Sequence, residues 1–324
     1  MNSIDDALTL DSIVQERRSE TGELHSIWPT KSSKPVFPNT FKSVDVIICI
    51  HNALERVTSC LQSVIDHTRQ PYNLFLVNDG SDISTSSFLR DFSLRHGSAL
   101  IESKDALKYT RAANIGMSLS RSDYGLFLNS DTVVSSCWLD KLVECGESDD
   151  NIGIVGPLSN AAAYQSVPFT KNEAGQWIRN SLPEGTTPGS ADKIIDALSE
   201  RWFPRVPFLN GFCFLVKRHV MSRVGCFDEI AFPQGYGEEI DYCLRTRQAG
   251  IELAVADHVY VFHTRSASYG HERRMALSAE AREKLNEKHG AKVLAAARDS
   301  LYRNKELEAI RRRIATSFEC LNRK

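Results

Sequence analysis

The stretch Val44–Ile50, which reads VDVIICI, decides the fold class of this 324-residue chain. It is a short run of mostly β-branched and apolar residues, as in strands that are buried on both faces of a parallel sheet. Helical spacing follows at once, because apolar residues recur every three or four positions over residues 53–68. A strand followed directly by an amphipathic helix is the first half of a βαβ unit.

The same alternation continues through the first half of the chain. Residues 74–77, 100–102 and 124–128 are typical of strands, and residues 86–96 and 110–120 are typical of helices. We therefore predict an α/β domain with a Rossmann-like, mostly parallel, doubly wound sheet. Ligands of such sheets bind beyond the carboxyl ends of the strands, so the polar residues that follow each strand form the candidate site.

The second half of the chain is less regular. Residues 159–207 read as a long excursion that contains one helical piece. The other expected elements are strands at 152–156, 208–216, 251–256 and 259–263, and helices at 191–202, 218–224, 239–249 and from about 274 to the end.

These patterns divide the chain into three parts. We predict a variable N-terminal extension at 1–42, with one helix near 3–18, and a C-terminal helical tail at 271–324. Between them lies one domain at 43–270, which we divide into two halves, 43–135 and 136–270.

Composition excludes several classes of protein. Hydrophobic residues make up 42% and charged residues 25% of the chain, as in ordinary globular proteins. The net charge of −2 argues against a nucleic-acid partner. The eight cysteines form no CxxC pair, so we expect buried, reduced thiols. We find no leader pattern and no apolar run near the roughly 20 residues of a membrane span, and we expect a cytoplasmic protein.

Polar residues follow two of the expected strands. The stretch 129–131 (NSD) ends in Asp131, and a carboxylate there can hold Mg²⁺ or Mn²⁺ together with waters and substrate phosphates. In the stretch 77–82 (VNDGSD), the carboxylate of Asp79 can accept hydrogen bonds from a base or a ribose. Asn, Ser, Asp and Gly are also common turn formers, so each stretch alone is equally open to a structural interpretation.

Three acids, Glu238, Glu239 and Asp241, stand at the start of an expected helix. They could simply compensate the helix dipole. An acid beside other acids and an apolar wall would instead have a raised pKa and could act as a general base. His263 ends a later strand and could bind a metal or a phosphate, or be structural.

The ordered combination is more specific than any of its parts. The motifs arrive as 45–52 (DVIICIHN), 77–82 (VNDGSD), 111–116 (RAANIG), 127–131 (FLNSD), 210–215 (NGFCFL), 225–229 (GCFDE) and 237–245 (GEEIDYCLR). This series resembles the family 2 glycosyltransferases, which have the GT-A fold, over about residues 44–290. The resemblance is of the bacterial polysaccharide or O-antigen type.

The resemblance implies an inverting, metal-dependent transfer of a hexosyl or deoxyhexosyl group from a nucleotide-diphosphate sugar to a hydroxyl. It implies that Glu239 is the base, with Glu238 as a rival, and that Asp131 and His263 hold Mg²⁺ or Mn²⁺. The donor-binding positions that it implies are Asn52, Asp79, Arg111, Asn114, Asn129, Ser130, Asp131 and Arg245. Two departures stand out: Asn129 replaces the first acid of the family's DxD motif, and Glu239 replaces an Asp.

The chain lacks the QxxRW motif of the processive members, which favours addition of single sugars to a glycan or lipid-linked glycan acceptor. Two alternatives remain open. A nucleotidyltransferase would need a glycine-rich, basic loop after the first strand, and residues 51–54 (HNAL) do not provide one. A non-catalytic sugar-binding or nucleotide-binding module is the other.

The tail carries 14 Lys and Arg against 8 Asp and Glu, a net charge of +6 over residues 271–324. Apolar residues recur there at spacings of mostly three or four, namely Leu301, Leu307, Ile310, Ile314, Phe318 and Leu321. A basic amphipathic helix can lie on an anionic membrane surface. The same pattern also fits a helix packed on its own domain or a dimer contact.

Overall fold

A mixed sheet forms the centre of the computed structural model, which describes residues 24–27, 42–264 and 271–323. Its strand order is β1-β4-β3-β2-β5-β8-β7-β9. The strands are β1 (Leu24–Ile27), β2 (Val44–Ile50), β3 (Tyr72–Asp79), β4 (Ala99–Ser103), β5 (Tyr124–Leu128), β7 (Ile152–Leu158), β8 (Cys213–Lys217) and β9 (Glu252–Tyr260). β1 and β8 run against the other six strands, so the sheet is mostly parallel, as predicted.

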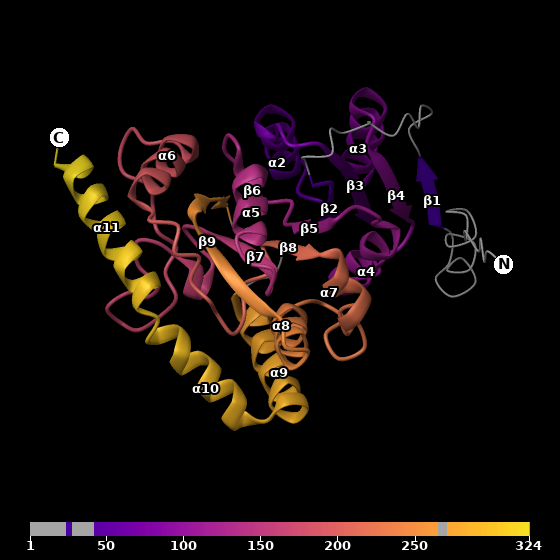
Figure 1. Cartoon of the computed structure of the whole chain (residues 1–324). Helices are drawn as coiled ribbons and strands as arrows, with labels where there is room; N and C mark the ends of the chain where they lie inside the picture. Colours follow the sequence, from indigo (N-terminus) through magenta and orange to yellow (C-terminus); the bar gives the residue numbers. More distant parts are fainter. Residues whose placement is uncertain (1–23, 28–41, 265–270, 324) are drawn as a thin grey trace, which may run out of the picture.

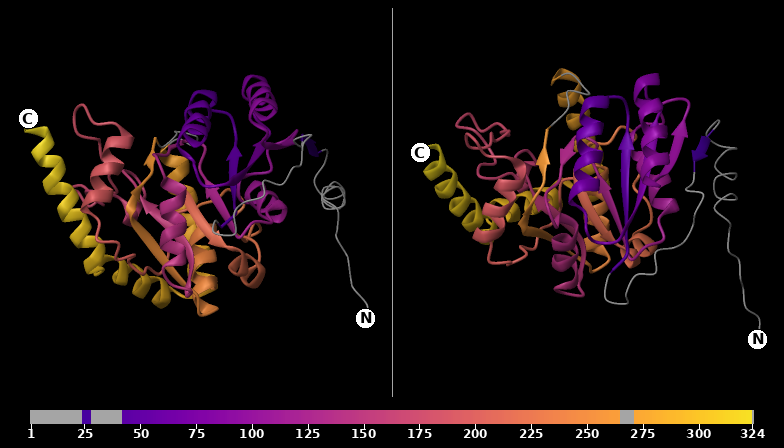
Figure 2. Two further views of the ribbon diagram at one scale, coloured as in Figure 1. Left: turned by 45° about the horizontal axis from the view of Figure 1, so that its top comes forward. Right: turned by 90° about the horizontal axis from the view of Figure 1, so that it is seen from above.

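Helices cover both faces of this sheet (Figures 1 and 2). One core contains Val46 and Ile48 of β2 with α2 (Leu54–His67), α3 (Ile83–His96) and α5 (Trp138–Glu147). The opposite core contains Ile47 and apolar residues of six further helices. These are α4 (Tyr109–Leu119), α6 (Pro188–Leu198), α7 (Arg218–Val224), α8 (Glu238–Gln248), α10 (Ala291–Tyr302) and α11 (Lys305–Asn322). Alternate residues of one strand thus enter two cores, which explains its continuous apolar run.

Close packing of α4 on β2 depends on a glycine. A Cβ at Gly116 would lie 2.3 Å from Cγ2 of Ile47, well inside van der Waals contact. Gly116 therefore allows the helix that carries Arg111 and Asn114 to lie directly on the central strand.

The C-terminal tail forms three helices, of which α9 (His271–His289) comes first. In Figure 1, α10 and α11 run along the edge of the molecule opposite β1. The apolar face of α11 is buried in the domain core, including Leu307, Ile310 and Ile314. The structure therefore agrees with the interpretation of the tail as a helix that packs on its own domain. In the part of the chain that the structure describes, every helix is too short or too polar to cross a membrane.

Several predicted elements differ from the observed ones. The strand expected at 208–216 is confined to β8, because residues 211–212 form a turn instead. The strands expected at 251–256 and 259–263 are one strand, β9, followed by the two-residue β10 (Phe262–His263). β1 was not predicted and lies within the predicted extension, whose expected helix at 3–18 is outside the described residues. All eight cysteines are free thiols as expected, but Cys226 and Cys320 are exposed rather than buried.

Candidate functional site

A small second sheet joins two distant parts of the chain at the end of β5. Strand β6 (Thr132–Val133) pairs antiparallel with β10, so that His263 lies opposite Thr132. This pairing brings Nε2 of His263 to 3.1 Å from Oδ1 of Asp131. Both side chains are nearly buried, since each residue is 8% exposed. The two residues that the sequence predicted as metal ligands therefore lie together.

The ring of His263 is held from its other side. Its Nδ1 lies 3.2 Å from the carbonyl oxygen of Ala161, so both ring nitrogens face groups that accept hydrogen bonds. A neutral ring carries one N–H and can donate to only one of them. With that proton on Nδ1, the lone pair of Nε2 faces the carboxylate of Asp131, and both groups can then act as ligands of one cation. An imidazole nitrogen and a carboxylate are suitable ligands for Mn²⁺, and Mg²⁺ also takes carboxylates, with phosphate oxygens completing the shell.

The backbone of His263 is fixed by Asn160, a residue that sequence reasoning missed. Oδ1 of Asn160 accepts from the His263 backbone N–H at 2.8 Å, and Nδ2 donates to its carbonyl at 3.1 Å. Asn160 itself is fully buried. A side-chain amide that hydrogen-bonds both backbone polar groups of another residue fixes the position of that residue. The sequence spacing contains no signal that predicts this pairing.

The candidate base residues form a second cluster, at the N-terminus of α8. The backbone N–H of Gly237 donates to carboxylate oxygens of both Glu238, at 3.1 Å, and Glu239, at 3.0 Å. Gly237 has φ of 138°, and a Cβ there would lie 2.9 Å from the ring of Phe232. Glycine is therefore required for the turn that directs the two carboxylates together.

Burial and mutual repulsion set the charge state of this acid pair. Loss of solvation raises the pKa of Glu238 well above its ordinary value, and the neighbouring Glu239 raises it further. Burial also raises the pKa of Glu239, but backbone hydrogen bonds oppose the change. Glu238 therefore holds a proton more strongly, and Glu239 is the carboxylate that ionises first. This order suits Glu239 to the role of base.

The turn at Gly211 and Phe212 joins the two clusters. A Cβ at Gly211 would lie 3.3 Å from Cβ of Glu239, so the backbone passes directly against the acid pair. The ring of the next residue, Phe212, stacks on His263 with centroids 5.4 Å apart and an interplanar angle of 14°. The Phe212 carbonyl also accepts from the backbone N–H of Asn129 at 2.8 Å. Two consecutive residues thus place the acid pair beside the His263 and Asp131 pair.

The third part of the site lies at the ends of β2 and β3. Asp79 is 5% exposed, and its carboxylate accepts from the backbone N–H of Leu107. Burial raises the pKa of Asp79, with hydrogen bonds from the 107–108 backbone opposing it. Asn52 accepts from the backbone N–H of Asp82 at 2.7 Å, and His51 contacts the Asp79 carbonyl at 2.7 Å. These contacts join the residues that follow β2 and β3 at the sheet edge. His51, which follows an expected strand, was assigned no role from the sequence.

Two residues predicted to bind the donor make hydrogen bonds to the loop before α8. The side chain of Asn114 pairs with the N–H and carbonyl of Phe227, each at 3.0 Å, and with Glu229. The guanidinium of Arg245 is divided among Asp241 and the carbonyls of Val224 and Cys226. Both side chains hold the loop before α8 in place, and their predicted contact with the donor stays a prediction.

The remaining predicted residues stay near the site. Asn129 and Ser130 are half-buried next to Asp131. Arg111 is half-buried in the first turn of α4 and has no ion pair with any residue that the structure describes. Tyr109, at the first position of that helix, was not singled out by the sequence. It lies close enough to Glu238 and Glu239 for their charges to raise its pKa, after burial as the main cause.

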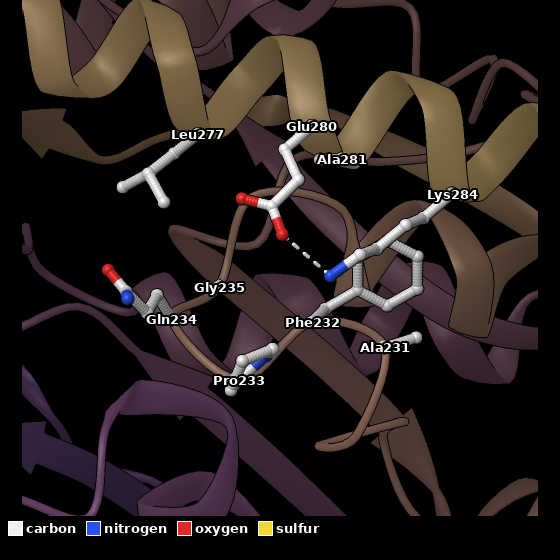
Figure 3. Close-up of a pocket in the computed structure, with 9 residues that line it drawn as sticks. All are labelled: Ala231, Phe232, Pro233, Gln234, Gly235, Leu277, Glu280, Ala281 and Lys284. Atoms are coloured by element: carbon white, nitrogen blue, oxygen red, sulfur yellow. Dashed lines mark hydrogen bonds and ion pairs between the residues drawn. The ribbon is translucent and has the colours of Figure 1, made fainter.

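A buried ion cluster holds the helix of the acid pair. Asp241 of α8 is fully buried and meets Arg245, Lys288 and His289, each at 2.8 Å. The last two belong to α9, so this helix is clamped onto α8. A small pocket between α9 and the loop before α8 is bordered by Phe232, Gly235 and the Glu280–Lys284 ion pair (Figure 3).

Comparisons with known proteins identify the family and the fold of the chain. A sequence profile described as "Glycosyl transferase family 2" matches residues 45–225, more than half of the chain. An uncharacterized glycosyltransferase of Haemophilus influenzae is 29% identical over 35% of this chain and 35% of its own length. The hyaluronan synthase of Pasteurella multocida is 23% identical over 71% of this chain. The chain spans only about a quarter of that synthase.

Two solved structures share the fold. GalNAc-T7 with UDP, GalNAc and Mn²⁺ has a TM-score of 0.55 and 19% identity, over 71% of this chain and 45% of that one. A Pyrobaculum calidifontis mannosyltransferase in complex with GDP-Man and Mn²⁺ has a TM-score of 0.52 and 14% identity, over 88% of both chains. The fold is that of the GT-A glycosyltransferases, and the chain belongs to glycosyl transferase family 2.

Proposed function

We propose that this protein is an inverting glycosyltransferase that moves one sugar from a nucleotide-diphosphate donor to a hydroxyl of a glycan or lipid-linked glycan. The observation that carries the proposal is the Gly211–Phe212 turn, which places the acid pair beside Asp131 and His263. A proton acceptor and a diphosphate-binding pair at one strand edge are the two parts that the transfer needs.

The proposed chemistry assigns a role to each cluster. Glu239 accepts the proton of the acceptor hydroxyl while that oxygen attacks the anomeric carbon and the bond to the diphosphate breaks. Asp131 and His263 would hold Mg²⁺ or Mn²⁺, which supplies positive charge beside the leaving diphosphate. Mn²⁺ in both related structures supports this assignment. Asp79, Asn52 and Arg111 bind the nucleotide, and holding both substrates in line lowers the barrier further.

Residues 43–135 provide the donor half in this proposal, and residues 136–270 provide most of the acceptor half. The names of the Pasteurella hyaluronan synthase and an Escherichia coli chondroitin synthase support a role in polysaccharide assembly. Any contact with a cytoplasmic membrane surface would rest on exposed basic side chains such as Arg312, because the apolar face of α11 is buried.

A two-stage experiment tests the function. We expect UDP, GDP or dTDP with Mn²⁺ to raise the melting temperature, and one base to be preferred. The corresponding sugar nucleotide should then be turned over, slowly by hydrolysis and faster with an acceptor. Nucleotide binding without any turnover would favour the non-catalytic module, and release of pyrophosphate from a nucleoside triphosphate and a sugar phosphate would favour the nucleotidyltransferase.

A further inference from the structure

A cluster of aromatic and cationic side chains lies on the excursion that follows β7. We call it the Trp177 platform, and it consists of Tyr164, Lys171, Trp177, Arg298 and Tyr302. Trp177 is 42% exposed and Tyr302 is 51% exposed, so two large rings face solvent. Exposed aromatic rings gathered together are unusual on a surface that contacts only water.

The rings of the Trp177 platform are held in a fixed arrangement. Tyr164 meets Trp177 edge to face at 4.8 Å between centroids, and meets Tyr302 in the same way at 5.1 Å. The ammonium of Lys171 lies 4.9 Å from the centre of the Trp177 ring and 5.0 Å from that of Tyr302. A short hairpin carries Lys171 opposite Trp177, and α10 supplies Tyr302. The platform is therefore preorganised from two separate segments.

The Trp177 platform is connected to the candidate active site through the short segment that carries Tyr164. Tyr164 belongs to the short 3-10 helix η1 (Ala163–Gln165). Ala161, just before this helix, contacts the ring of His263. Gln165, directly after Tyr164, accepts at 2.6 Å from the backbone N–H of Asn210, the neighbour of the Gly211 turn. Residues 161–165 thus contact both His263 and the neighbour of the Gly211 turn, and they also carry Tyr164, on which the other two rings of the platform pack.

The cations of the Trp177 platform have no carboxylate partner among the described residues. Lys171 and Arg298 form no ion pair with any residue inside the described ranges, and Arg298 acts electrostatically on both tyrosines. Arg311 of α11 binds the carbonyls of Tyr164 and Ser166 instead of a carboxylate. Burial lowers its pKa to about 10, although the charge of Glu308 opposes the change. The surface is complementary to a negative charge.

Trp202 is also partly exposed beside a cation, but it differs from Trp177 in that this cation has an acidic partner. Trp202 is 38% exposed and has the guanidinium of Arg313 at 5.2 Å from its ring. Arg313, however, is already paired with Glu200. Arg313 and Arg311 are two positions apart on α11, so they point to nearly opposite sides of the helix. Trp202 therefore lies on the other side of α11, with its cation neutralised.

We propose that the Trp177 platform binds a negatively charged sugar of the acceptor glycan, at a position removed from the hydroxyl that reacts. A pyranose ring has an apolar C–H face that can stack on an indole, and its carboxylate would meet the unpaired cations. This inference rests on the proposed transferase function and specifies the class of its acceptor as an acidic glycan.

Calorimetric titration of the full-length protein tests the inference. The probes are a hyaluronan hexasaccharide, which carries carboxylates, and neutral chitohexaose. We expect hyaluronan to bind more tightly, and Trp177→Ala to weaken its binding by about tenfold. Trp202→Ala is the matched control and should change the affinity by less than about twofold. Lys171→Met, which keeps most of the side-chain length, should weaken hyaluronan binding and leave any binding of chitohexaose unchanged.

Several outcomes would overturn the inference. They are no binding of hyaluronan by the wild type, equal affinity for the two probes, and equal affinities of Trp177→Ala and the wild type. Stabilisation by nucleotide and Mn²⁺, measured on the same samples, keeps the two hypotheses apart. If nucleotide stabilises Trp177→Ala and the wild type equally while hyaluronan fails to bind, the acceptor assignment is wrong and the transferase proposal stands.

Discussion

The Nε2 atom of His263 lies 3.1 Å from Oδ1 of Asp131, although 132 positions separate the two residues along the chain. The contact depends on the pairing of β10 with β6, which holds both residues at the edge of the main sheet. An imidazole nitrogen and a carboxylate oxygen that are nearly buried and face each other are suitable ligands for a divalent cation. Their arrangement therefore leads to a prediction about metal binding.

Asp131→Asn and His263→Ala should each lower the transfer rate by about 100-fold or more, because each removes a proposed ligand. Both variants should also lose the Mn²⁺-dependent part of the thermal shift with nucleotide, and EDTA should abolish it in the wild type. Asp150→Asn, at an exposed position, is the control and should behave as the wild type. Full Mn²⁺ dependence in either site variant would contradict the assignment.

Glu239→Gln should reduce the transfer rate by about 100-fold to 10,000-fold and leave the nucleotide-dependent thermal shift intact. Because the base must be ionised and burial raises its pKa, the wild-type rate should fall as pH drops through that raised pKa. A pH–rate profile measures this acid limb. An unchanged rate in Glu239→Gln would remove this residue from the role of base and leave Glu238 as the candidate.

The charge state of Glu238 predicts an unusual dependence of stability on pH. Its pKa is higher in the folded protein than in the unfolded chain, so the folded state binds more protons above the ordinary value of 4.5. The free energy of unfolding must therefore decrease as pH rises through this interval. Glu238→Gln imitates the protonated acid, and it should raise the melting temperature at pH 8 by more than at pH 5. A larger gain at pH 5 would show that the sign is wrong.

Asp241→Asn should destabilise the protein by about 3 kcal/mol, because it leaves three cationic or polar partners without their buried carboxylate. Burial opposes the charge of Asp241, but Lys288, Arg245 and His289 hold its pKa below the ordinary value of 3.8. The loss should therefore be full at neutral pH and shrink as pH falls through that lowered pKa. Urea unfolding measures it.

Asp228→Asn provides the matched control for this cluster. Its carboxylate also meets Lys288, at 2.6 Å, but its side chain is 30% exposed. Solvent screens such a pair, so we expect a loss well below that of Asp241→Asn. Equal losses in the two variants would mean that burial of the cluster contributes nothing.

Gly116→Ala should destabilise the fold by about 1–3 kcal/mol, because the new methyl group would overlap with Ile47 and force α4 away from β2. Gly189→Ala is a fitting control, since it lies in α6 with only the hydroxyl of Thr187 at 4.0 Å. That change should be neutral or stabilising by up to about 1 kcal/mol. Thermal unfolding of the two variants side by side decides the comparison.

The sequence predicted the elements whose patterns are local. Strand β2 and helix α2 were found where expected, because a doubly buried strand is continuously apolar and its helix is amphipathic. Strand β1 was missed, since four residues that pair on a sheet edge carry no periodic signal. The strand expected at 208–216 began too early, because Gly211 turns the chain against Glu239, a contact that only the tertiary structure reveals.

The candidate site was predicted in outline for the same reason. Asp131, His263 and the acid pair follow strands or open a helix, and those places converge in any sheet of this kind. Asn114 and Arg245 illustrate what the sequence alone does not distinguish. An amide or a guanidinium that binds a loop carbonyl looks the same in the sequence as one that binds a ligand. Asn160 shows the converse, because its pairing with His263 spans 103 positions.

The pairing of β6 with β10 also has a consequence for how acceptor preference can change. The pairing holds Asp131 and His263 at the edge of the main sheet, and Asn160 fixes the backbone of His263. The hairpin that carries Trp177 lies beyond Asn160 and η1, so residues 169–178 can be exchanged while those two anchors stay. On the acceptor role proposed for the Trp177 platform, acceptor choice is separable from the chemistry, and a transplanted hairpin should bring its own glycan preference.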